Sequence, residues 1–201
     1  MFKKIYKSFW FLIFIVSISS INVNAVEKEN FLSVGDKKAK IIVKVFSSLT
    51  CPHCAHFHTN NFKNLKKDFI DKGHVRFEHH SFPLDLAALN AEKILNCSID
   101  NEKKLIFLNE LYEKQDQWAV GSDINSINSK LIKMAKNYGL NDDMINNCLS
   151  DEKLEEKILN SRIDGHKKYS ITSTPTILIN EKKYDGDHKY KNFKKVINKL
   201  L

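Results

Sequence analysis

The sequence is poor in the residues that mark specialised chain types, with six glycines, three prolines, four cysteines and two tryptophans among 201 residues. So little glycine and proline excludes collagen-like and low-complexity chains. A dense block of lysine and arginine interleaved with aromatics is also missing, so the net charge of +8 does not indicate nucleic-acid binding. The 42% hydrophobic content that is present suits one domain with a buried core, or one domain with a sizeable insertion.

The first 25 residues have the pattern of a secretory signal peptide. Three lysines precede an apolar run over residues 9–18, and small residues lead up to Ala25. The run is short for a membrane span of about 20 residues, although an uncleaved anchor is the alternative. We therefore expect cleavage after Ala25 and export, which places the four cysteines where disulfides form and persist.

Hydrophobic periodicity predicts two groups of strands and helices, which are separated by a block of helices alone. Apolar, β-branched residues over 40–47 indicate a buried strand, followed by a helix that starts at Pro52, ends at Gly73 and leads to a strand over 75–82. Residues 84–166 show only helical spacing, with possible caps at Ser122-Asp123, Asn141-Asp142 and Asp151 and an expected end near Gly165. A strand over 176–179, another from Tyr184 and a helix over 190–201 complete the chain. The pattern predicts an α/β sheet domain interrupted by helices.

Two cysteines stand three positions apart in Cys51-Pro52-His53-Cys54, directly after the first expected strand. Proline favours the first turn of a helix, so Cys51 is expected at a helix N-terminus, where free N–H groups and the helix dipole stabilise a thiolate. Cys54 lies one turn later, within reach of a disulfide, and His53 adds a nearby donor or, when protonated, a positive charge. The pattern predicts a redox-active pair with Cys51 as the thiolate.

A zinc site is the main alternative for this segment, because His56 and His58 follow the cysteines and zinc accepts two Cys and two His. On one helix, Cys51, Cys54 and His58 could share a face, whereas His56 points away from it. A purely structural disulfide between the two cysteines is a weaker alternative, because so tight a loop constrains little chain. We expect no metal and no cofactor at this site.

The chain resembles the DsbA-type thiol:disulfide oxidoreductases, which have a thioredoxin fold with an inserted all-helical domain. The resemblance rests on the Cys-Pro-His-Cys motif, on Thr174-Pro175-Thr176 before a strand, and on the size and position of the helical block. The roughly 120 residues between the two motifs agree with it, because a bare βαβ unit takes about 30 residues or more. It implies a thioredoxin-like domain in two parts, residues 26–84 and 167–201, separated by a helical insertion over 85–166.

The resemblance implies a periplasmic oxidase that introduces disulfide bonds into newly exported, unfolded proteins. Cys51 and Cys54 would be catalytic, with Pro52 and His53 between them. The Thr174–Pro175 bond would be cis, would face the cysteines and would hold an extended substrate segment. A membrane quinone-linked oxidase of the DsbB type is the implied partner that re-oxidises the pair. A disulfide isomerase or reductase of the same fold is the alternative function.

One departure from the family pattern concerns proton transfer. Thioredoxin-like proteins often carry a buried acid six positions before the first motif cysteine, and here that position is Val45. The route by which Cys54 loses its proton is therefore left open by the sequence. Two smaller departures, Ser173 before the Thr-Pro pair and Asn180-Glu181 in the following turn, touch only turn geometry.

The remaining cysteines, Cys97 and Cys148, both fall inside the helical block. A bridge between them would close a loop of about 50 residues, worth about 4 kcal/mol in the chain-entropy model. We expect a structural disulfide, since the chain is expected to be exported and some DsbA-like proteins carry a second pair. Two buried free thiols and a second redox relay are the alternatives.

Overall fold

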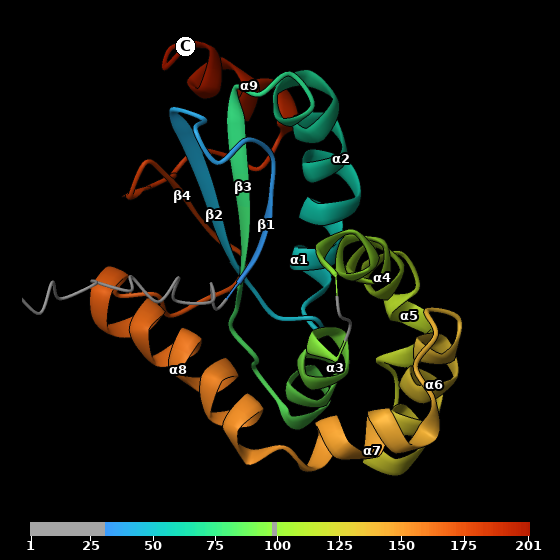
Figure 1. The fold of residues 1–201 in the computed structure, drawn as a ribbon. Coiled ribbons are helices and arrows are strands. Elements are labelled where there is room, and N and C mark those ends of the chain that lie inside the picture. The colour runs from blue at the N-terminus through green and yellow to red at the C-terminus, as the bar shows by residue number, and fades with distance from the viewer. Residues whose placement is uncertain (1–30, 98–99) are drawn as a thin grey trace, which may run out of the picture.

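The computed structural model describes residues 31–97 and 100–201, and the expected signal peptide, residues 1–25, lies outside them. A five-stranded sheet in the order β1-β3-β2-β4-β5 forms the centre of the described chain (Figure 1). Its strands are β1 (Leu32–Val34), β2 (Ile41–Ser47), β3 (Val75–Ser81), β4 (Thr176–Ile179) and β5 (Lys182–Lys183). β2 is parallel to β3 and antiparallel to β4, so the segments on both sides of the helical block join in one sheet.

One face of the sheet is covered by the helical segment that follows the cysteines and by the last helix. These are α1 (Pro52–His56), η1 (Phe57–Phe62), α2 (Lys63–Leu65), η2 (Lys66–Ile70) and α9 (Tyr190–Asn198). Alternate residues of a strand share a face, so Val43, Val45 and Phe77 pack together against phenylalanines of these helices. The sequence predicts one regular helix here, whereas η1 and η2 are π-helical turns, which side-chain spacing does not reveal.

The opposite face packs against α8 (Glu152–Tyr169), which Figure 1 shows on the other side of the sheet from α1. A Cβ atom added at Gly165 would lie 2.8 Å from the ring of Phe46 on β2, so glycine permits the close approach of helix and sheet. The prediction that the helix ends near Gly165 is therefore wrong, because this glycine is a packing contact. The helix ends instead where Ser170 takes a left-handed φ of 51°.

In the described residues of the block between β3 and β4, five further helices precede α8. They are α3 (Leu86–Asn96), α4 (Asn101–Glu113), α5 (Gln115–Trp118), α6 (Ile124–Lys136) and α7 (Asp142–Ser150). Asp123, Asn141 and Asp151 accept backbone N–H groups at the starts of α6, α7 and α8, which confirms the predicted caps. The architecture is the thioredoxin fold with inserted helices that the sequence predicts. None of the helices described is long and apolar enough to cross a membrane.

Two short strands differ from the sequence prediction. β1, which the periodicity does not predict, pairs antiparallel with the outer side of β3. β5 lies before Tyr184 because Asn180 and Glu181 already complete the turn, with φ values of 47° and 68°. Glu181 keeps this unusual backbone for a non-glycine residue while its carboxylate pairs with Lys44 at 2.5 Å. Glu181, which stands where the family pattern often has glycine, thus forms an ion pair with Lys44 on the neighbouring strand β2.

Candidate active site

Cys51 and Cys54 lie where β2 delivers the chain to the start of α1. Cys51 has an extended backbone and caps the helix, and Pro52 is its first residue. The backbone N–H of Cys54 donates to the carbonyl of Cys51 at 3.0 Å, closing the first turn. Both thiols are free in this structure, and their exposed fractions are 7% for Cys51 and 1% for Cys54. A reacting partner can therefore reach only the first sulfur.

The surroundings of Cys51 stabilise a thiolate and lower its pKa to about 5. The largest cause is a hydrogen bond from the Cys54 thiol; the Thr174 side chain and the backbone N–H groups of Cys54 and His53 add to it, against the opposing effect of burial. Both N–H groups belong to the first turn of α1, at the positive end of the helix dipole. His53 thus acts on the thiolate through its backbone, while its side chain is exposed.

Cys54 has the opposite tendency, because burial raises the pKa of its thiol well above the ordinary range. The hydrogen bond with Cys51 raises it further. The two sulfurs are thus unequal, with Cys51 ionised and Cys54 protonated at neutral pH. Any reaction that releases Cys54 from a disulfide must bring it a proton.

The Thr174–Pro175 peptide bond is cis and lies against the cysteines. The Cys51 thiol donates to the carbonyl oxygen of Thr174 at 3.4 Å, although 123 positions separate the two residues. Within the described chain the Thr174 hydroxyl is buried without a partner of ordinary hydrogen-bond geometry. It remains available to the sulfurs, and it favours the ionised form of both. The fold thereby brings the two sequence motifs into contact.

A residue of the helical block that sequence reasoning missed holds this loop in place. Gln115, the first residue of α5, donates from Nε2 to the carbonyl of Leu49 at 2.7 Å and to the carbonyl of Cys51 at 3.1 Å. Both carbonyls precede α1, so one amide group fixes the approach to the helix. The polar stretch around Gln115 carries no local signal of this role, which arises only when the block folds against the sheet.

The two histidines considered as zinc ligands have different surroundings. His56 is exposed, whereas His58 is buried and its Nε2 is 2.7 Å from Oδ1 of Asn109. Burial lowers the pKa of His58 to about 3. Within residues 31–97 and 100–201, no three His, Cys, Asp or Glu side chains gather closely enough to hold a metal ion. The geometry favours thiol chemistry at this site.

The chain is similar to a known family and to solved structures over most of its length. Residues 27–199 match the family model described as thioredoxin. The crystal structure of alpha-DsbA1 from Wolbachia pipientis is 32% identical and has a TM-score of 0.78, with 86% of this chain and 92% of that chain covered. The chain belongs to the thioredoxin family, in its DsbA-type branch. The similarity extends over most of the chain, and so includes both the cysteine and proline motifs and the inserted helices.

Two further relatives of this DsbA-type chain have names that refer to disulfide chemistry. Disulfide bond formation protein D of Bacillus subtilis is 28% identical over 177 residues, which are 84% of this chain and 76% of that protein. A Rickettsia bellii protein named as a protein-disulfide oxidoreductase is 28% identical over 152 residues, or 76% of this chain. The match covers only 58% of the Rickettsia protein's own length.

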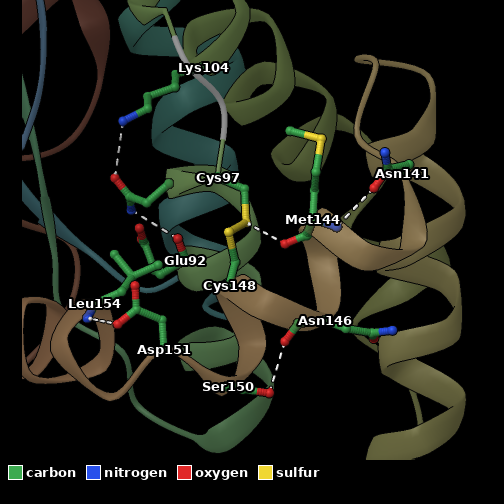
Figure 2. The surroundings of a disulfide bond; sticks show 11 residues. Glu92, Cys97, Lys104, Asn141, Met144, Asn146, Cys148, Ser150, Asp151 and Leu154 are labelled. Atoms are coloured by element: carbon green, nitrogen blue, oxygen red, sulfur yellow. Dashed lines mark hydrogen bonds between the residues drawn. A yellow bond between two sulfur atoms is a disulfide. The ribbon is translucent and has the colours of Figure 1, made fainter.

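A second sulfur pair of this DsbA-type chain joins two helices of the inserted block. Cys97, at the end of α3, and Cys148, in α7, form a disulfide with Cα atoms 6.0 Å apart (Figure 2). The loop that this bond closes includes the start of α7, where Asn141 is the cap. The structure therefore has the bridge expected from the sequence, and not the two free thiols considered as an alternative. The bond fastens α7 to α3.

Proposed function

We propose that this protein is an exported thiol:disulfide oxidase that introduces disulfide bonds into newly translocated proteins. The observation that carries the proposal is the Cys51 sulfur, which has a pKa of about 5 and lies 3.4 Å from the carbonyl oxygen of Thr174. A dithiol whose reduced form holds a stabilised thiolate gives up its disulfide readily and so oxidises other thiols. The names of the relatives support this chemistry.

The reaction follows from the inequality of the two sulfurs. A substrate thiolate attacks Cys51 in the oxidised pair, the bond between Cys51 and Cys54 breaks, and its electron pair goes to the Cys54 sulfur. A second substrate thiolate then attacks the substrate sulfur of the mixed disulfide. Cys51 leaves with the electron pair as the stabilised thiolate, and the substrate leaves oxidised by two electrons. The 1% exposure of Cys54 directs the first attack to Cys51.

The substrate segment would lie beside the cis proline. A mostly polar cavity of about 350 Å³ opens there, lined in part by Ser173, Pro175, Asp185 and His188. An extended chain can pair with backbone groups next to Pro175 while its cysteine reaches Cys51. Recognition through the backbone suits an oxidase that must accept many unfolded sequences.

Export and re-oxidation complete the proposal. Residues 1–25 serve as a signal peptide cleaved after Ala25, and the mature protein works in the periplasm. There a membrane oxidase of the DsbB type takes two electrons from the Cys51–Cys54 dithiol and passes them to a quinone. Both parts rest on the sequence pattern and on membership of the DsbA-type branch.

A redox titration of the mature protein against glutathione tests the proposed direction. We expect a potential nearer to the value of about −120 mV for DsbA itself than to the value of about −270 mV for thioredoxin. A potential close to that of thioredoxin would indicate a reductase and would contradict the proposal. Faster recovery of a scrambled substrate than of a reduced one would indicate an isomerase. Zinc bound stoichiometrically to the reduced protein would favour the metal-site alternative.

A further inference from the structure

A cluster of polar side chains is buried next to the cysteines. Its members come from β2, β3, α3 and α4, and at most 5% of each is exposed: Ser47, His79, Ser81, Glu92 and Tyr112. Tyr112 also belongs to the same core cluster as Cys54. Buried polar groups cost stability unless they are satisfied, so such a cluster requires a physical explanation. The thiol exchange described above does not yet use any of the five.

The acidic member of the cluster is held firmly in place. Glu92 Oε1 is 2.9 Å from Nε2 of His79, and Glu92 Oε2 accepts a hydrogen bond of 2.8 Å from the Ser81 hydroxyl. His79 pairs in register with Val45 on the neighbouring strand. Partners in register point to the same face of a sheet. The histidine and carboxylate therefore lie on the sheet face where thioredoxin-like proteins often carry their buried acid.

Tyr112 shares a core cluster with the cysteines and has a ring contact with His79. The centroid of its ring is 6.4 Å from that of His79, in an edge-on arrangement. Its hydroxyl has no hydrogen-bond partner of ordinary geometry within the described chain. Burial raises the pKa of Tyr112 well above its ordinary value, and the charges of Cys54 and Glu92 raise it further. The Tyr112 hydroxyl is therefore protonated at neutral pH, and it is close enough to Cys54 and Glu92 for their charges to act on it.

The other buried titratable groups nearby are less suited to serve Cys54. The ring of His58 lies 4.7 Å from that of Tyr112, but a pKa of about 3 keeps it neutral at working pH. Glu78 and His80 occupy the alternate positions of β3 and therefore face α8, where His80 stacks on Phe46 at 4.7 Å. The titratable groups that face Tyr112 are thus Cys54 and Cys51 at the start of α1, His58 on η1, His79 on β3 and Glu92 on α3, and the Ser47 hydroxyl at the end of β2 lies beside them.

We propose that Tyr112, backed by the His79–Glu92 pair, is the acid–base group that passes a proton to and from Cys54. This inference rests on the proposed function. In it, Tyr112 takes the role of the buried acid that is missing at Val45. When a substrate thiolate breaks the Cys51–Cys54 bond, the released Cys54 sulfur takes the proton of the Tyr112 hydroxyl. The His79–Glu92 pair returns a proton to Tyr112. Re-oxidation runs the same transfer in reverse, so the side chains end unchanged.

The test measures how fast the oxidised protein oxidises a peptide dithiol between about pH 5.5 and pH 8, in the wild type and in Tyr112→Phe. General acid–base catalysis predicts a loss of about tenfold to a hundredfold in rate and a changed pH profile. The hydroxyl makes no hydrogen bond of ordinary geometry in the described chain and has only the Ser47 side chain beside it, so the urea midpoint of Tyr112→Phe should stay close to that of the wild type. Unchanged rate and pH profile in Tyr112→Phe would overturn the inference.

Two further variants separate this role from packing. Tyr138→Phe removes another hydroxyl of the helical block, one that bonds to Glu110, and should leave the rate unchanged. Glu92→Gln keeps the shape of the side chain without its charge and should slow the reaction like Tyr112→Phe; if it does not fold, Tyr112→Phe decides alone. A wild type that oxidises no dithiol refutes the proposed function. A wild type that does so, with Tyr112→Phe equally fast at every pH, refutes only the role of Tyr112.

Discussion

The carbonyl oxygen of Thr174 faces the Cys51 sulfur at 3.4 Å and accepts a hydrogen bond from its thiol. Once Cys51 ionises, this carbonyl has no proton to share, and the hydroxyl of the same residue becomes the available donor. One residue therefore offers an acceptor to the thiol and a donor to the thiolate. The side chain of Thr174 should accordingly affect reactivity more than stability.

Thr174→Val tests this division, because valine keeps the shape of threonine and removes the hydroxyl. We expect the pKa of Cys51 to rise above about 5 and the protein to become less oxidising. Thr174→Ser, which keeps the hydroxyl, is the matched control and should stay near the wild type. The thiolate absorbance of the reduced protein, followed as a function of pH, measures both. Equal titration curves for the valine and serine variants would show that the hydroxyl is not involved.

His53 should act on Cys51 through its backbone N–H. His53→Pro removes that N–H together with the imidazole, and we expect it to raise the pKa of Cys51. His53→Ala removes only the imidazole, so its thiolate titration should stay close to the wild type. A rise of equal size in both variants would assign the effect to the imidazole, as the sequence first suggested.

Stability of the reduced protein should depend on pH through Cys51. Its pKa falls from 9.0 to about 5 on folding, so ionisation stabilises the folded state fully above about pH 9, and the effect is lost as pH falls through 5. The raised pKa of Cys54 costs stability only above its ordinary value and leaves this window unaffected. We expect the melting temperature of the reduced protein, relative to the oxidised one, to increase from pH 5 to about pH 8.

The matched control for this experiment is a variant that cannot form the thiolate. Cys51→Ser keeps a small polar side chain at the helix start and should lose the pH-dependent part of the melting difference. A reduced wild type whose advantage is flat across the window would contradict the assigned thiolate. Calorimetry on both redox forms makes the comparison.

The bridge between Cys97 and Cys148 should contribute to stability. Cys97→Ser opens a loop of 51 positions and should lower the free energy of unfolding by about 4 kcal/mol if chain entropy dominates. Urea denaturation measures the change, and Cys148→Ser should match it because either substitution breaks the same bond. A modest shift in the potential of the active pair is also expected. Mass mapping of the oxidised wild type that finds a single bridge would refute this prediction.

Local chemistry explains which parts of the fold could be predicted. Three helix starts could be predicted from their caps, because a cap side chain accepts N–H groups only a few positions away. These caps are Asp123, Asn141 and Asp151. β1 has only three residues, Leu32–Val34, and owes its strand conformation to pairing with β3, which no short pattern contains. Gly165 has the pattern of a helix end but is a packing contact, because both roles use a residue without a side chain.

The residues of the candidate site also differ in whether the sequence near them predicts their role. Cys51 and Cys54 could be found from spacing, since their chemistry depends on one helix start. The place of Pro175 followed from resemblance alone, because 123 positions separate Thr174 from Cys51. Gln115 and Tyr112 carry no local signal, as polar and aromatic residues are ordinary in helices. Their significance appears only when the block lies against the loop before α1.

The hydrogen bonds of Gln115 bear on attempts to shorten this protein. A chain that joined β3 directly to β4 would keep Cys51, Cys54 and Pro175, and would look like a minimal version of the fold. It would lose the amide that holds the carbonyls of Leu49 and Cys51, leaving both without that donor. A shortened version should therefore keep the helical block together with the sheet, because the strands alone lack this support for the loop before α1.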